Sequence, residues 1–511
     1  MAATRRSRKA ARRRRMIRRI KLAALIAVIV IAIAFIIVSC TKKKPSDSAE
    51  KPAAVQVTEE PVTAVETEAP EVYVPEETPE PTPELTAEPM LEITPESGPA
   101  GEPAETEAEP DAGEAGAEPV MPAAPVVTVD TIVAFENEQS ADGSALRSAR
   151  IRSVGDFVIH EQLYTQAKAL GRETQAYKYD FTPMLSYIRD YFADADYTVA
   201  NVDGPMGGEG KRGYASYPQF NTPEDLIPIL KDCGVDMLTL SNNHALDTYF
   251  DGFKAQIKNL QACGMDYCGG AATQQEHDTP VIREINGIKI GFLNYTTSTN
   301  TMENYCSKDA VKYGVNTVGN ANFSKDVKAM RAAGAEVIVA YMHWGKEYER
   351  TPNADQRTYA KKLAKAGVDV IIGSHPHVVQ PTYWLSTGQE DGTVKKCLCV
   401  CSLGNFISNQ RKSVNKKGET ELEYTDEGIL FDFTIRETEP GKFEIVAPAY
   451  IPIYVWRTDT ADGGFMYNVL PIGDYYAERP DGMADADYER MKEAYGEVID
   501  WLGTEIKTYN W

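Results

Sequence analysis

From about residue 126 onward, short apolar runs rich in β-branched residues alternate with longer segments that have a helical period. Such runs predict strands, and the amphipathic segments between them predict helices. The predicted strands cover residues 148–154, 196–202, 236–241, 288–295, 336–342, 369–373, 379–386, 396–402, 428–436 and 443–456. The predicted helices cover residues 181–192, 223–233, 252–263, 322–333, 353–366 and 484–503.

The order of these segments predicts an α/β fold with a largely central sheet, because strands alternate with helices over most of the domain. The last strands, over 379–456, follow one another without helices, which predicts a mixed sheet. Thr222-Pro223 is expected to begin a helix, with the threonine as N-cap and the proline in the first helical position. Asn286-Gly287, between two apolar runs, predicts a hairpin turn.

The N-terminus predicts attachment to a membrane. A basic run from Arg5 to Lys21 precedes the 18 uncharged residues from Leu22 to Ser39, and Cys40 follows. This apolar run is long enough to span the hydrocarbon core as a helix, and the basic run would keep the N-terminus in the cytoplasm. The residues before Cys40 also resemble a lipoprotein signal, so a lipid anchor at Cys40 is the alternative. Both interpretations place the globular part at the cell membrane, on its outer side.

Charge divides the chain into three parts. Residues 1–44 hold 14 Lys or Arg and no acid, whereas residues 45–120 hold 21 Asp or Glu and one base. Sixteen of the 30 prolines lie within 45–125, so this segment is predicted to be an extended, disordered linker. The folded domain is expected over 126–410, and 411–511 is expected to be a C-terminal extension packed on it. Residues 121–511 hold 38 Lys or Arg and 54 Asp or Glu, and this acidity argues against nucleic acid as the main partner, because phosphate binding needs a basic surface.

The cysteines after Cys40 number seven, and their spacing is typical of neither a disulfide framework nor a zinc finger. Cys397, Cys399 and Cys401 alternate along a predicted strand, so they share one of its faces. We expect them to be small apolar core residues rather than metal ligands.

Four of the six histidines follow predicted strands. They are His244, His343, His375 and His377. In an open α/β sheet, the loops at the carboxyl ends of the strands form the ligand crevice. Two imidazoles at i and i+2 in extended backbone, as expected for His375 and His377, would also project to the same side. The four side chains are therefore predicted to converge on one site.

Two carboxylates, Asp156 and Asp203, also follow predicted strands. Carboxylates combined with neutral imidazoles suit Zn, Mn or Fe, and the absence of cysteine from these loops argues against a structural zinc site. Each residue alone has an ordinary interpretation as a turn residue, a helix cap or a loop histidine. Together they predict a site for one or two divalent ions. The alternative is a sheet protein with structural histidines, whose thermal stability would not change on chelation.

Six short motifs follow one another along the chain. They are Gly155-Asp156, Asn201-Val202-Asp203, Ser241-Asn242-Asn243-His244-Ala245-Leu246-Asp247, His343-Trp344-Gly345-Lys346-Glu347-Tyr348, Gly373-Ser374-His375-Pro376-His377 and Ser402-Leu403-Gly404-Asn405-Phe406. Over about residues 147–410 this set resembles the bacterial capsule synthesis protein CapA family, which is linked to poly-γ-glutamate capsules. That family is similar in fold to the calcineurin-like metallophosphoesterases. The resemblance therefore implies a metallo-dependent phosphatase-like β-sandwich flanked by helices.

The resemblance also implies a role for each matching residue. The implied metal ligands are Asp156, the bridging Asp203, Asn243, His343, His375 and His377. His244, oriented by Asp247, would give a proton to the leaving group. Glu347 and Asn405 would contact substrate or lie behind the ligands, and a plain structural role for either is equally open.

Two positions depart from the pattern of that superfamily. Val158 stands where the superfamily has the histidine of an Asp-x-His motif, so one ion would lose a ligand. His160, four residues after Asp156, could replace it or could be an ordinary loop histidine. Asp203 stands where the capsule family usually has glutamate, so the bridging side chain is one methylene shorter. Phosphoesterase activity therefore does not follow from the fold alone.

We expect a cell-surface protein of capsule synthesis or export that acts as a metal-dependent hydrolase on a phosphoester or on an amide of a polyanionic polymer. The alternative is a non-catalytic, metal-containing component that binds the polymer or helps to export it. The expected partners are the membrane, an anionic capsule or cell-envelope polymer, and membrane subunits of a polymer synthase. The acidic composition counts against tight binding of polyglutamate away from the ions.

Overall fold

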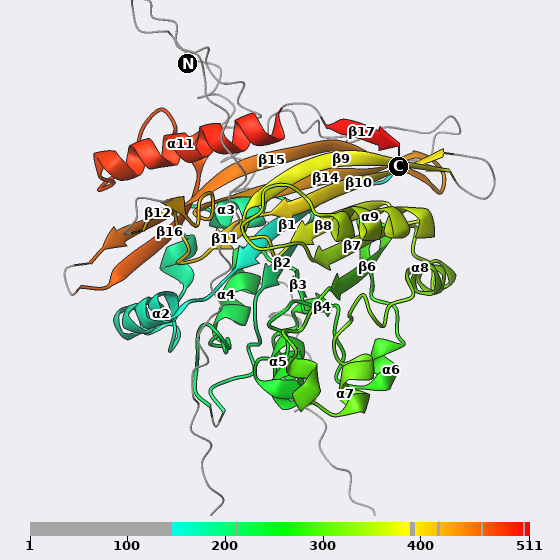
Figure 1. The fold of residues 1–511 in the computed structure, drawn as a ribbon, viewed down its shortest axis with the longest axis horizontal. Coiled ribbons are helices and arrows are strands. Elements are labelled where there is room, and N and C mark those ends of the chain that lie inside the picture. Colours follow the sequence, from blue (N-terminus) through cyan, green and yellow to red (C-terminus); the bar gives the residue numbers. More distant parts are fainter. Residues whose placement is uncertain are drawn as a thin grey trace, which may run out of the picture. The chain divides into compact units, whose positions relative to one another are not determined.

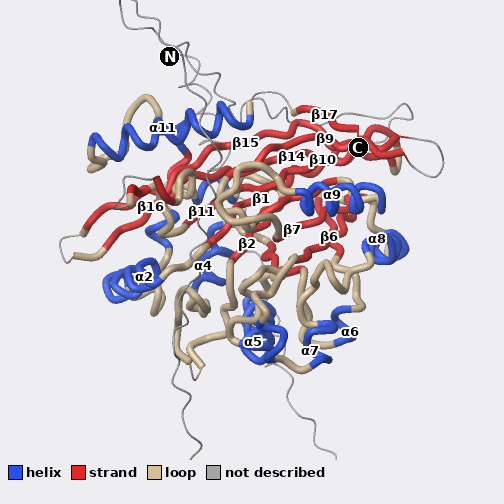
Figure 2. The backbone as a smooth tube through the Cα atoms, in the orientation of Figure 1, coloured by secondary structure: helices blue, strands red, loops and turns tan. Residues whose placement is uncertain are grey.

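The computed structural model describes residues 146–210, 212–388, 394–415, 420–460, 463–503 and 506–510. These residues form two large β-sheets with helices packed on them (Figures 1 and 2). The predicted mixed α/β fold is confirmed, but the expectation of one largely central sheet is wrong, because the strands divide between two sheets. The predicted anchor and linker lie outside the described residues. No described helix is long and apolar enough to cross a membrane.

The first sheet combines a parallel half with an antiparallel half. Its strands, in spatial order, are β16 (Phe465–Pro471), β15 (Lys442–Asp459), β14 (Glu427–Glu439), β1 (Ser148–Phe157), β2 (Tyr197–Val202), β3 (Met237–Thr239) and β4 (Asp266–Cys268). Strands β1 to β4 run parallel, and β14 to β16 run antiparallel to their neighbours. The short strand β11 (Asn405–Ile407) pairs with the end of β1. The carboxyl ends of β1, β2 and β3 therefore lie at one edge.

The second sheet is also mixed, as the helix-free run of strands predicted. Its strands, in spatial order, are β17 (Lys507–Asn510), β9 (Val379–Gly388), β10 (Val394–Leu403), β8 (Val370–Ser374), β7 (Val337–His343), β6 (Ile288–Thr296) and β5 (Ile282–Ile285). Strands β6, β7, β8 and β10 run parallel. A separate ribbon joins β12 (Ser413–Val414) to β13 (Thr420–Glu421).

Helices cover the outer face of each sheet (Figure 1). Four lie on the first sheet, namely α2 (Glu161–Thr174), α3 (Arg189–Phe192), α4 (Leu226–Cys233) and α5 (Tyr249–Cys263). Helices α8 (Phe323–Ala332) and α9 (Ala354–Ala366) lie on the second. Helix α11 (Asp485–Leu502) contacts β15, β14 and β9, so it reaches both sheets. The short helices are α6 (Gln274–His277), α7 (Lys308–Tyr313), α10 (Ile472–Tyr475) and the 3₁₀ turns Thr182–Leu185 and Met302–Tyr305.

The alternation of side chains along each strand explains these layers. In β7 all seven residues are buried. Val339 belongs to the core between the sheets, whereas the next residue, Ala340, belongs to the core beneath α8 and α9. A strand buried on both faces is apolar throughout. Cys397, Cys399 and Cys401 are free and buried in the helix-covered core, which confirms their prediction as core residues.

Of the two local predictions from short sequence motifs, the hairpin turn at Asn286-Gly287 is confirmed and the helix start at Thr222-Pro223 is not. Asn286 and Gly287 have φ angles of 49° and 79° in the turn between β5 and β6, so the predicted hairpin is confirmed. Helix α4 instead begins at Leu226 with Asp225 as its N-cap, so the predicted start at Thr222 is wrong. The backbone N–H of Thr222 donates to Pro205 O at 3.0 Å, which holds this residue in the preceding loop.

The predicted helix over 181–192 is interrupted. It divides into the 3₁₀ turn Thr182–Leu185 and the short helix α3. The pattern did not predict α2, although this helix buries Leu163 and Leu170 in the core on the first sheet. It also did not predict β4, β5, β16 and β17, which are all short strands at or near the sheet edges.

A buried ion pair fixes β1 to the C-terminal part of the chain. β14 pairs with β1 from Ser148↔Arg436 to Val154↔Leu430. In the middle of this ladder, Arg152 donates from Nε and Nη2 to the two carboxylate oxygens of Asp432, at 2.6 and 2.5 Å. Both side chains are buried. The strand that leads to Asp156 is therefore held by a residue 280 positions later in the chain.

Candidate metal centre

The six predicted ligands lie where parallel strands of both sheets end. Asp156, Asp203 and Asn243 come from the ends of β1, β2 and β3 or from the loops after them, and His343, His375 and His377 come from β7 and the loop after β8. The two sets meet, because His377 Nδ1 lies 3.2 Å from Asp156 Oδ2 and His343 Nε2 lies 3.0 Å from Asn243 Oδ1. The structure thus brings together all six side chains that the sequence predicted.

Two motif glycines permit this approach. A Cβ on Gly155 would lie 2.2 Å from Gly404 O, the carbonyl that accepts the N–H of Asp156 at 3.0 Å. A Cβ on Gly373 would lie 1.9 Å from Cys401 O. Any side chain at either position would push β1 away from Gly404, or β8 away from β10, and so displace a strand that leads to the candidate ligands.

The two carboxylates are bridged by a residue that the sequence analysis quoted but gave no role. Asn201 Nδ2 donates to Asp156 Oδ1 and to Asp203 Oδ1, both at 2.8 Å. Thr239 Oγ1 donates to Asn201 Oδ1 at 3.0 Å, which fixes which end of the amide faces the carboxylates. The signal was present, because Asn201 and Asp203 are two residues apart on a strand and so share a face.

His343 is oriented by its neighbours on both sides. Its Nδ1 lies 3.1 Å from Ser374 Oγ, and its Nε2 faces Asn243 Oδ1. Two ligand atoms that bind the same ion at 2.0–2.2 Å lie about 3 Å apart when they are adjacent. The 3.0 Å between His343 Nε2 and Asn243 Oδ1 matches this distance. Ser374 was also not singled out by the sequence, although it lies between two motif residues. A partner on the second ring nitrogen is the usual way in which a histidine ligand is oriented.

His375 and His377 reach the site in a conformation that the sequence did not predict. Both have left-handed backbones, with φ angles of 96° and 58°, so the expectation of extended backbone is wrong. Strand β8 ends at Ser374, and the N–H of His375 donates to Asp156 Oδ2 at 3.0 Å. Such conformations cost about 1–3 kcal/mol each and persist where the surrounding structure determines them. The two rings lie 6.0 Å apart between centroids.

Burial and like charges determine the protonation of the site. Burial raises the pKa of Asp203 to about 7, and the Asp156 carboxylate adds to the rise. Burial lowers the pKa of His375 to about 3 and holds the pKa of His343 well below its usual range. For His377, the contact with Asp156 outweighs burial and raises the pKa to about 9. His343 and His375 are therefore neutral, as metal ligands must be, whereas His377 would have to release a proton.

His244 and Asp247 form a separate pair beside the ligands. His244 Nδ1 lies 2.7 Å from Asp247 Oδ2, which also accepts the N–H of Phe220 at 2.7 Å. Both members of the pair are buried. Because the carboxylate holds the proton on Nδ1, the other ring nitrogen, Nε2, is left for a substrate group.

The two predicted substrate residues differ in exposure. Glu347 is partly exposed, in the loop after β7. Asn405 is fully buried at the start of β11, where its Nδ2 donates to Thr425 O and Gln410 Oε1 at 2.9 and 3.0 Å. No finding tests a role of either residue in substrate binding, so both stay predictions.

The structure does not bring His160 into the candidate centre. Its Nδ1 lies 3.1 Å from Val158 O and 3.3 Å from the backbone N of Asn409. Burial lowers the pKa of His160 to about 4, so the ring is neutral. It belongs to neither of the ligand groups formed by the described residues. Val158 is buried and apolar and has no side-chain atom that can bind an ion. The candidate ligand at the end of β1 is therefore Asp156.

Unpartnered donor atoms show that these residues fit a divalent ion. Asp203 Oδ2 and His375 Nδ1 are buried and have no hydrogen-bond partner, and the buried His377 Nδ1 makes no well-aligned hydrogen bond although Asp156 Oδ2 lies 3.2 Å away. Among the described residues, two groups have ligand atoms within 4.8 Å of one another, namely Asp156, Asp203, His377 and Glu347, His375, His377. Buried polar atoms are normally hydrogen-bonded. A cluster of carboxylate oxygens and ring nitrogens that lack such bonds therefore indicates a binding site for a cation.

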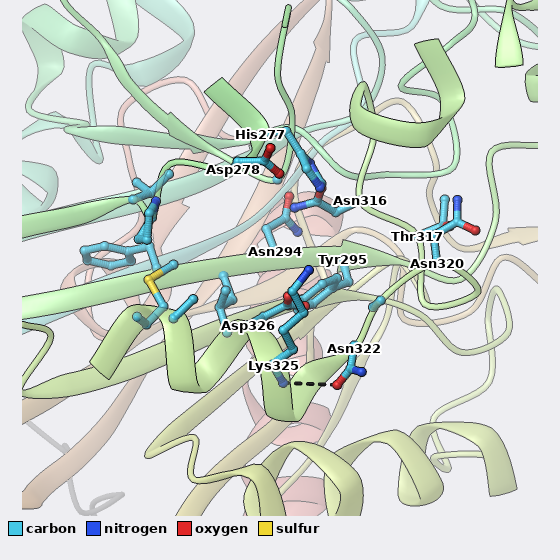
Figure 3. A pocket seen from close by; sticks show the side chains of 18 of the residues that line it. His277, Asp278, Asn294, Tyr295, Asn316, Thr317, Asn320, Asn322, Lys325 and Asp326 are labelled. Atoms are coloured by element: carbon cyan, nitrogen blue, oxygen red, sulfur yellow. Dashed lines mark hydrogen bonds between the residues drawn. The ribbon is translucent and has the colours of Figure 1, made fainter. Parts of the chain in front are cut away.

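Two clefts lie near the carboxyl ends of the strands. One, of about 510 Å³, is lined by Asn243, His343 and His375 together with Glu347 and Tyr348, so it opens directly onto the candidate centre. The other, of about 450 Å³, lies between β6, α8 and the loop after α6, where its walls carry mainly amide, hydroxyl and charged side chains (Figure 3). This second cleft contains none of the predicted site residues. Chemistry at the ions would therefore take place in the first cleft.

Comparison with known proteins agrees with the motifs. Residues 150–410 match the family described as "Bacterial capsule synthesis protein PGA_cap". The chain is 25% identical over 236 residues to capsule biosynthesis protein CapA of Bacillus anthracis, a match that covers 46% of this chain and 55% of that protein. It is 26% identical over 264 residues to PGA biosynthesis protein CapA of Bacillus subtilis, with 51% and 63% covered. The matches thus span less than two thirds of either relative.

A solved structure is also similar to this chain. The calcineurin-like phosphoesterase YfkN from Bacillus subtilis aligns with a TM-score of 0.35 and 15% sequence identity, covering 70% of this chain and 99% of that one.

Proposed function

The chain belongs to the bacterial capsule synthesis protein PGA_cap family, and from this premise we propose that it is a metal-dependent hydrolase of capsule polymer synthesis or export. The observation that carries the proposal is the cluster of buried side-chain atoms without hydrogen bonds at the ends of β2 and β8, on Asp203, His375 and His377. A purely structural cluster would satisfy its buried polar atoms internally. The proposed substrate is a phosphoester or an amide of an anionic polymer, which enters through the cleft beside Glu347 and Tyr348.

The proposed ligands are the carboxylates Asp156 and Asp203, the amide oxygen of Asn243, and the rings of His343, His375 and His377. Divalent ions bound there, one or two of Mn, Zn or Fe, would supply Lewis acidity for the activation of water and offset the negative charge of the transition state. Asn201 holds the carboxylates at a fixed separation, and Ser374 orients His343. These contacts reduce the rearrangement that ion binding requires.

His244 is the proposed general acid. Asp247 accepts a hydrogen bond from Nδ1–H, so the ring keeps one orientation, and in its doubly protonated form it would donate the Nε2 proton to the leaving group. The N–H of Phe220 donates to the same carboxylate oxygen and keeps it in place. General acid catalysis of this kind contributes about 10²–10⁴-fold to the rate.

The proposed location is the cell membrane, with the globular domain outside the cell. The support comes from the sequence, in which a basic run precedes the apolar segment 22–39 and Cys40 offers a lipid-anchor alternative. The proposed partners are an anionic capsule or envelope polymer and the membrane subunits of a polymer synthase.

The test uses the full-length protein and its His375→Ala and Asp247→Asn variants. Metal content is measured by plasma mass spectrometry after loading with Mn, Zn or Fe. Hydrolysis is measured on bis(p-nitrophenyl) phosphate and on poly-γ-glutamate, the latter by chain length. We expect the parent to hold one or two equivalents and to turn over one substrate. His375→Ala should lose both properties, whereas Asp247→Asn should keep the metal and lose about 10²-fold or more in kcat.

Each failure has a distinct meaning. A His375→Ala variant that stays metal-loaded and fully active would refute the proposed centre. A parent that binds metal and the polymer but hydrolyses neither substrate would instead support the non-catalytic, polymer-binding alternative.

A further inference from the structure

We propose that Glu347 is a metal ligand of this site, an assignment that rests on the metal centre of the proposed function. Its carboxylate stands beside His375 and His377, and ligand atoms of the three residues lie within 4.8 Å of one another. Donor atoms that share an ion at 2.0–2.2 Å are at most about 4.4 Å apart. A movement of the partly exposed Glu347 carboxylate by a few tenths of an ångström therefore suffices for common coordination.

The backbone places Glu347 at this position from both sides. Before it, the N–H of Trp344 donates to Ser374 O at 3.1 Å, and after it the N–H of Tyr348 donates to Pro376 O at 2.8 Å. The loop that carries Glu347 is thus hydrogen-bonded to the loop that carries both histidines. These two hydrogen bonds fix the position of Glu347 relative to residues 374–376, which a side chain in contact with solvent alone would not require.

Trp344 anchors this loop in the core. Its side chain is fully buried, and Nε1 donates to Cys401 O at 2.9 Å. Gly345, with a φ of 97°, allows the turn that follows, where a Cβ would meet the Gln356 side chain at 2.8 Å. Glu347 therefore projects from a rigid part of the molecule, as a precise ligand must.

The charges around Glu347 also favour a cation. Its neighbour Lys346 pairs with Glu349, at 2.5 Å, instead of with Glu347. In the described part of the chain, no Lys or Arg lies within ion-pair distance of the Glu347 carboxylate. The buried Nδ1 of His375 has no hydrogen-bond partner, and the buried Nδ1 of His377 faces the Asp156 carboxylate at 3.2 Å. One carboxylate and two imidazoles form a ligand set that suits Zn or Mn.

The end of β1 contributes few ligand atoms to the site, so a further ligand such as Glu347 is needed. Val158 has no donor atom and is buried, and His160 belongs to neither ligand group. The group of Asp156, Asp203 and His377 therefore gains no donor from the end of β1 beyond Asp156, whereas Glu347 adds a carboxylate to the second group, which shares His377 with the first. Glu347 comes from a different sheet and closes the site on the side of the cleft.

The experiment compares metal binding by the full-length parent, Glu347→Gln, Glu347→Asp and the control Glu349→Gln. Glu349→Gln removes an equal charge two residues away, at a side chain that pairs with Lys346 on the surface. Metal-free protein is titrated with Mn²⁺ or Zn²⁺ by calorimetry, and the visible spectrum of the Co²⁺-loaded protein reports changes in coordination. Neither readout depends on turnover.

We expect Glu347→Gln to bind one ion at least about tenfold more weakly or to lose it, and to change the Co²⁺ spectrum. Glu347→Asp, which keeps the charge, should be intermediate, and Glu349→Gln should match the parent. Affinities and spectrum of Glu347→Gln equal to those of the parent would overturn the assignment and leave Glu347 as a substrate contact. A parent that binds no metal would overturn this assignment and the proposed function together, whereas a loaded parent without turnover would affect only the proposed function.

Discussion

Replacement of Asn201 by alanine removes the amide that bridges the two central carboxylates. In the parent, Nδ2 donates to Asp156 and Asp203 at 2.8 Å, and Thr239 fixes the other end of the amide. The variant leaves one oxygen of each carboxylate and the Thr239 hydroxyl without this partner. Asp156 and Asp203 then face each other without a donor between them.

The expected loss is large, but it depends on pH. A hydrogen bond to a charged acceptor contributes about 1.5–3 kcal/mol, so two such bonds set an upper range of about 3–6 kcal/mol for metal-free protein. Protonation limits this loss, because burial and the Asp156 charge already raise the pKa of Asp203 to about 7 and the Asn201 amide lowers it. Without the amide this pKa rises further. Below the folded pKa, a proton on Asp203 replaces part of the lost interaction.

The sign of the pH dependence follows from linkage. In metal-free parent, the folded state holds a proton on Asp203 that the unfolded state releases near its ordinary pKa of 3.8, so stability falls as pH rises through about 7. In Asn201→Ala the pKa of Asp203 is higher, so the unfolding free energy continues to fall at pH values where that of the parent has levelled off. We therefore expect the difference in unfolding free energy between parent and variant to be larger at pH 8 than at pH 6.

Metal affinity gives a second measure of the same perturbation. Residues that orient ligands typically contribute 10–100-fold to affinity, which corresponds to about 1.4–2.7 kcal/mol. The assays are urea unfolding of metal-free protein at pH 6 and pH 8, and calorimetric titration with Mn²⁺. Asn259→Ala is the control, because it removes one hydrogen bond from α5 to Met206 O at 2.9 Å. A variant with parental metal affinity, or with a larger stability loss at pH 6 than at pH 8, would refute the role of Asn201.

Two further predictions concern stability. Burial lowers the pKa of His160 to about 4, so below about pH 6.5 the unfolded state takes up a proton at this residue and the folded state does not. Between pH 7 and pH 5 the unfolding free energy of the parent should therefore fall by about 2 kcal/mol more than that of His160→Gln. Equal falls, measured by chemical unfolding, would contradict this prediction. Asp432→Ala leaves the buried Arg152 charge unpaired and should cost about 3–5 kcal/mol in urea unfolding, most of which Arg152→Met/Asp432→Leu should restore. A double variant no more stable than Asp432→Ala would show that the loss comes from packing instead.

Local pattern predicted the parts of this protein that depend on neighbours in sequence. The ten predicted strands all occur, because alternating or continuous apolar runs specify which faces are buried. The turn at Asn286-Gly287 follows from the two residues that adopt positive φ most readily. The carboxylate and histidine candidates were predictable for the same reason, since polar residues directly after buried parallel strands lie at the carboxyl edge of a sheet, whereas Asn243 was implied only by the family resemblance.

Other features were locally ambiguous. Thr222-Pro223 has the composition of a helix start, but the hydrogen bond from Thr222 to Pro205 O delays the helix by a turn. His375 and His377 have no glycine or asparagine character that predicts a left-handed backbone. The His375 N–H donates to Asp156, which lies 219 residues away in sequence, so a contact that local sequence does not contain helps to hold this loop.

The sequence by itself therefore determined the strands, their buried faces and the chemical types of donor at their ends, because each depends on residues within a few positions. Only the tertiary structure decided that the strands form two sheets, that β14 lies beside β1, and that Glu347 stands next to His375 and His377. These arrangements depend on pairings between distant residues, such as Arg152 with Asp432. Periodicity states which face of a strand is apolar, but any other apolar face satisfies it equally well, and only the packing of the whole chain selects one partner.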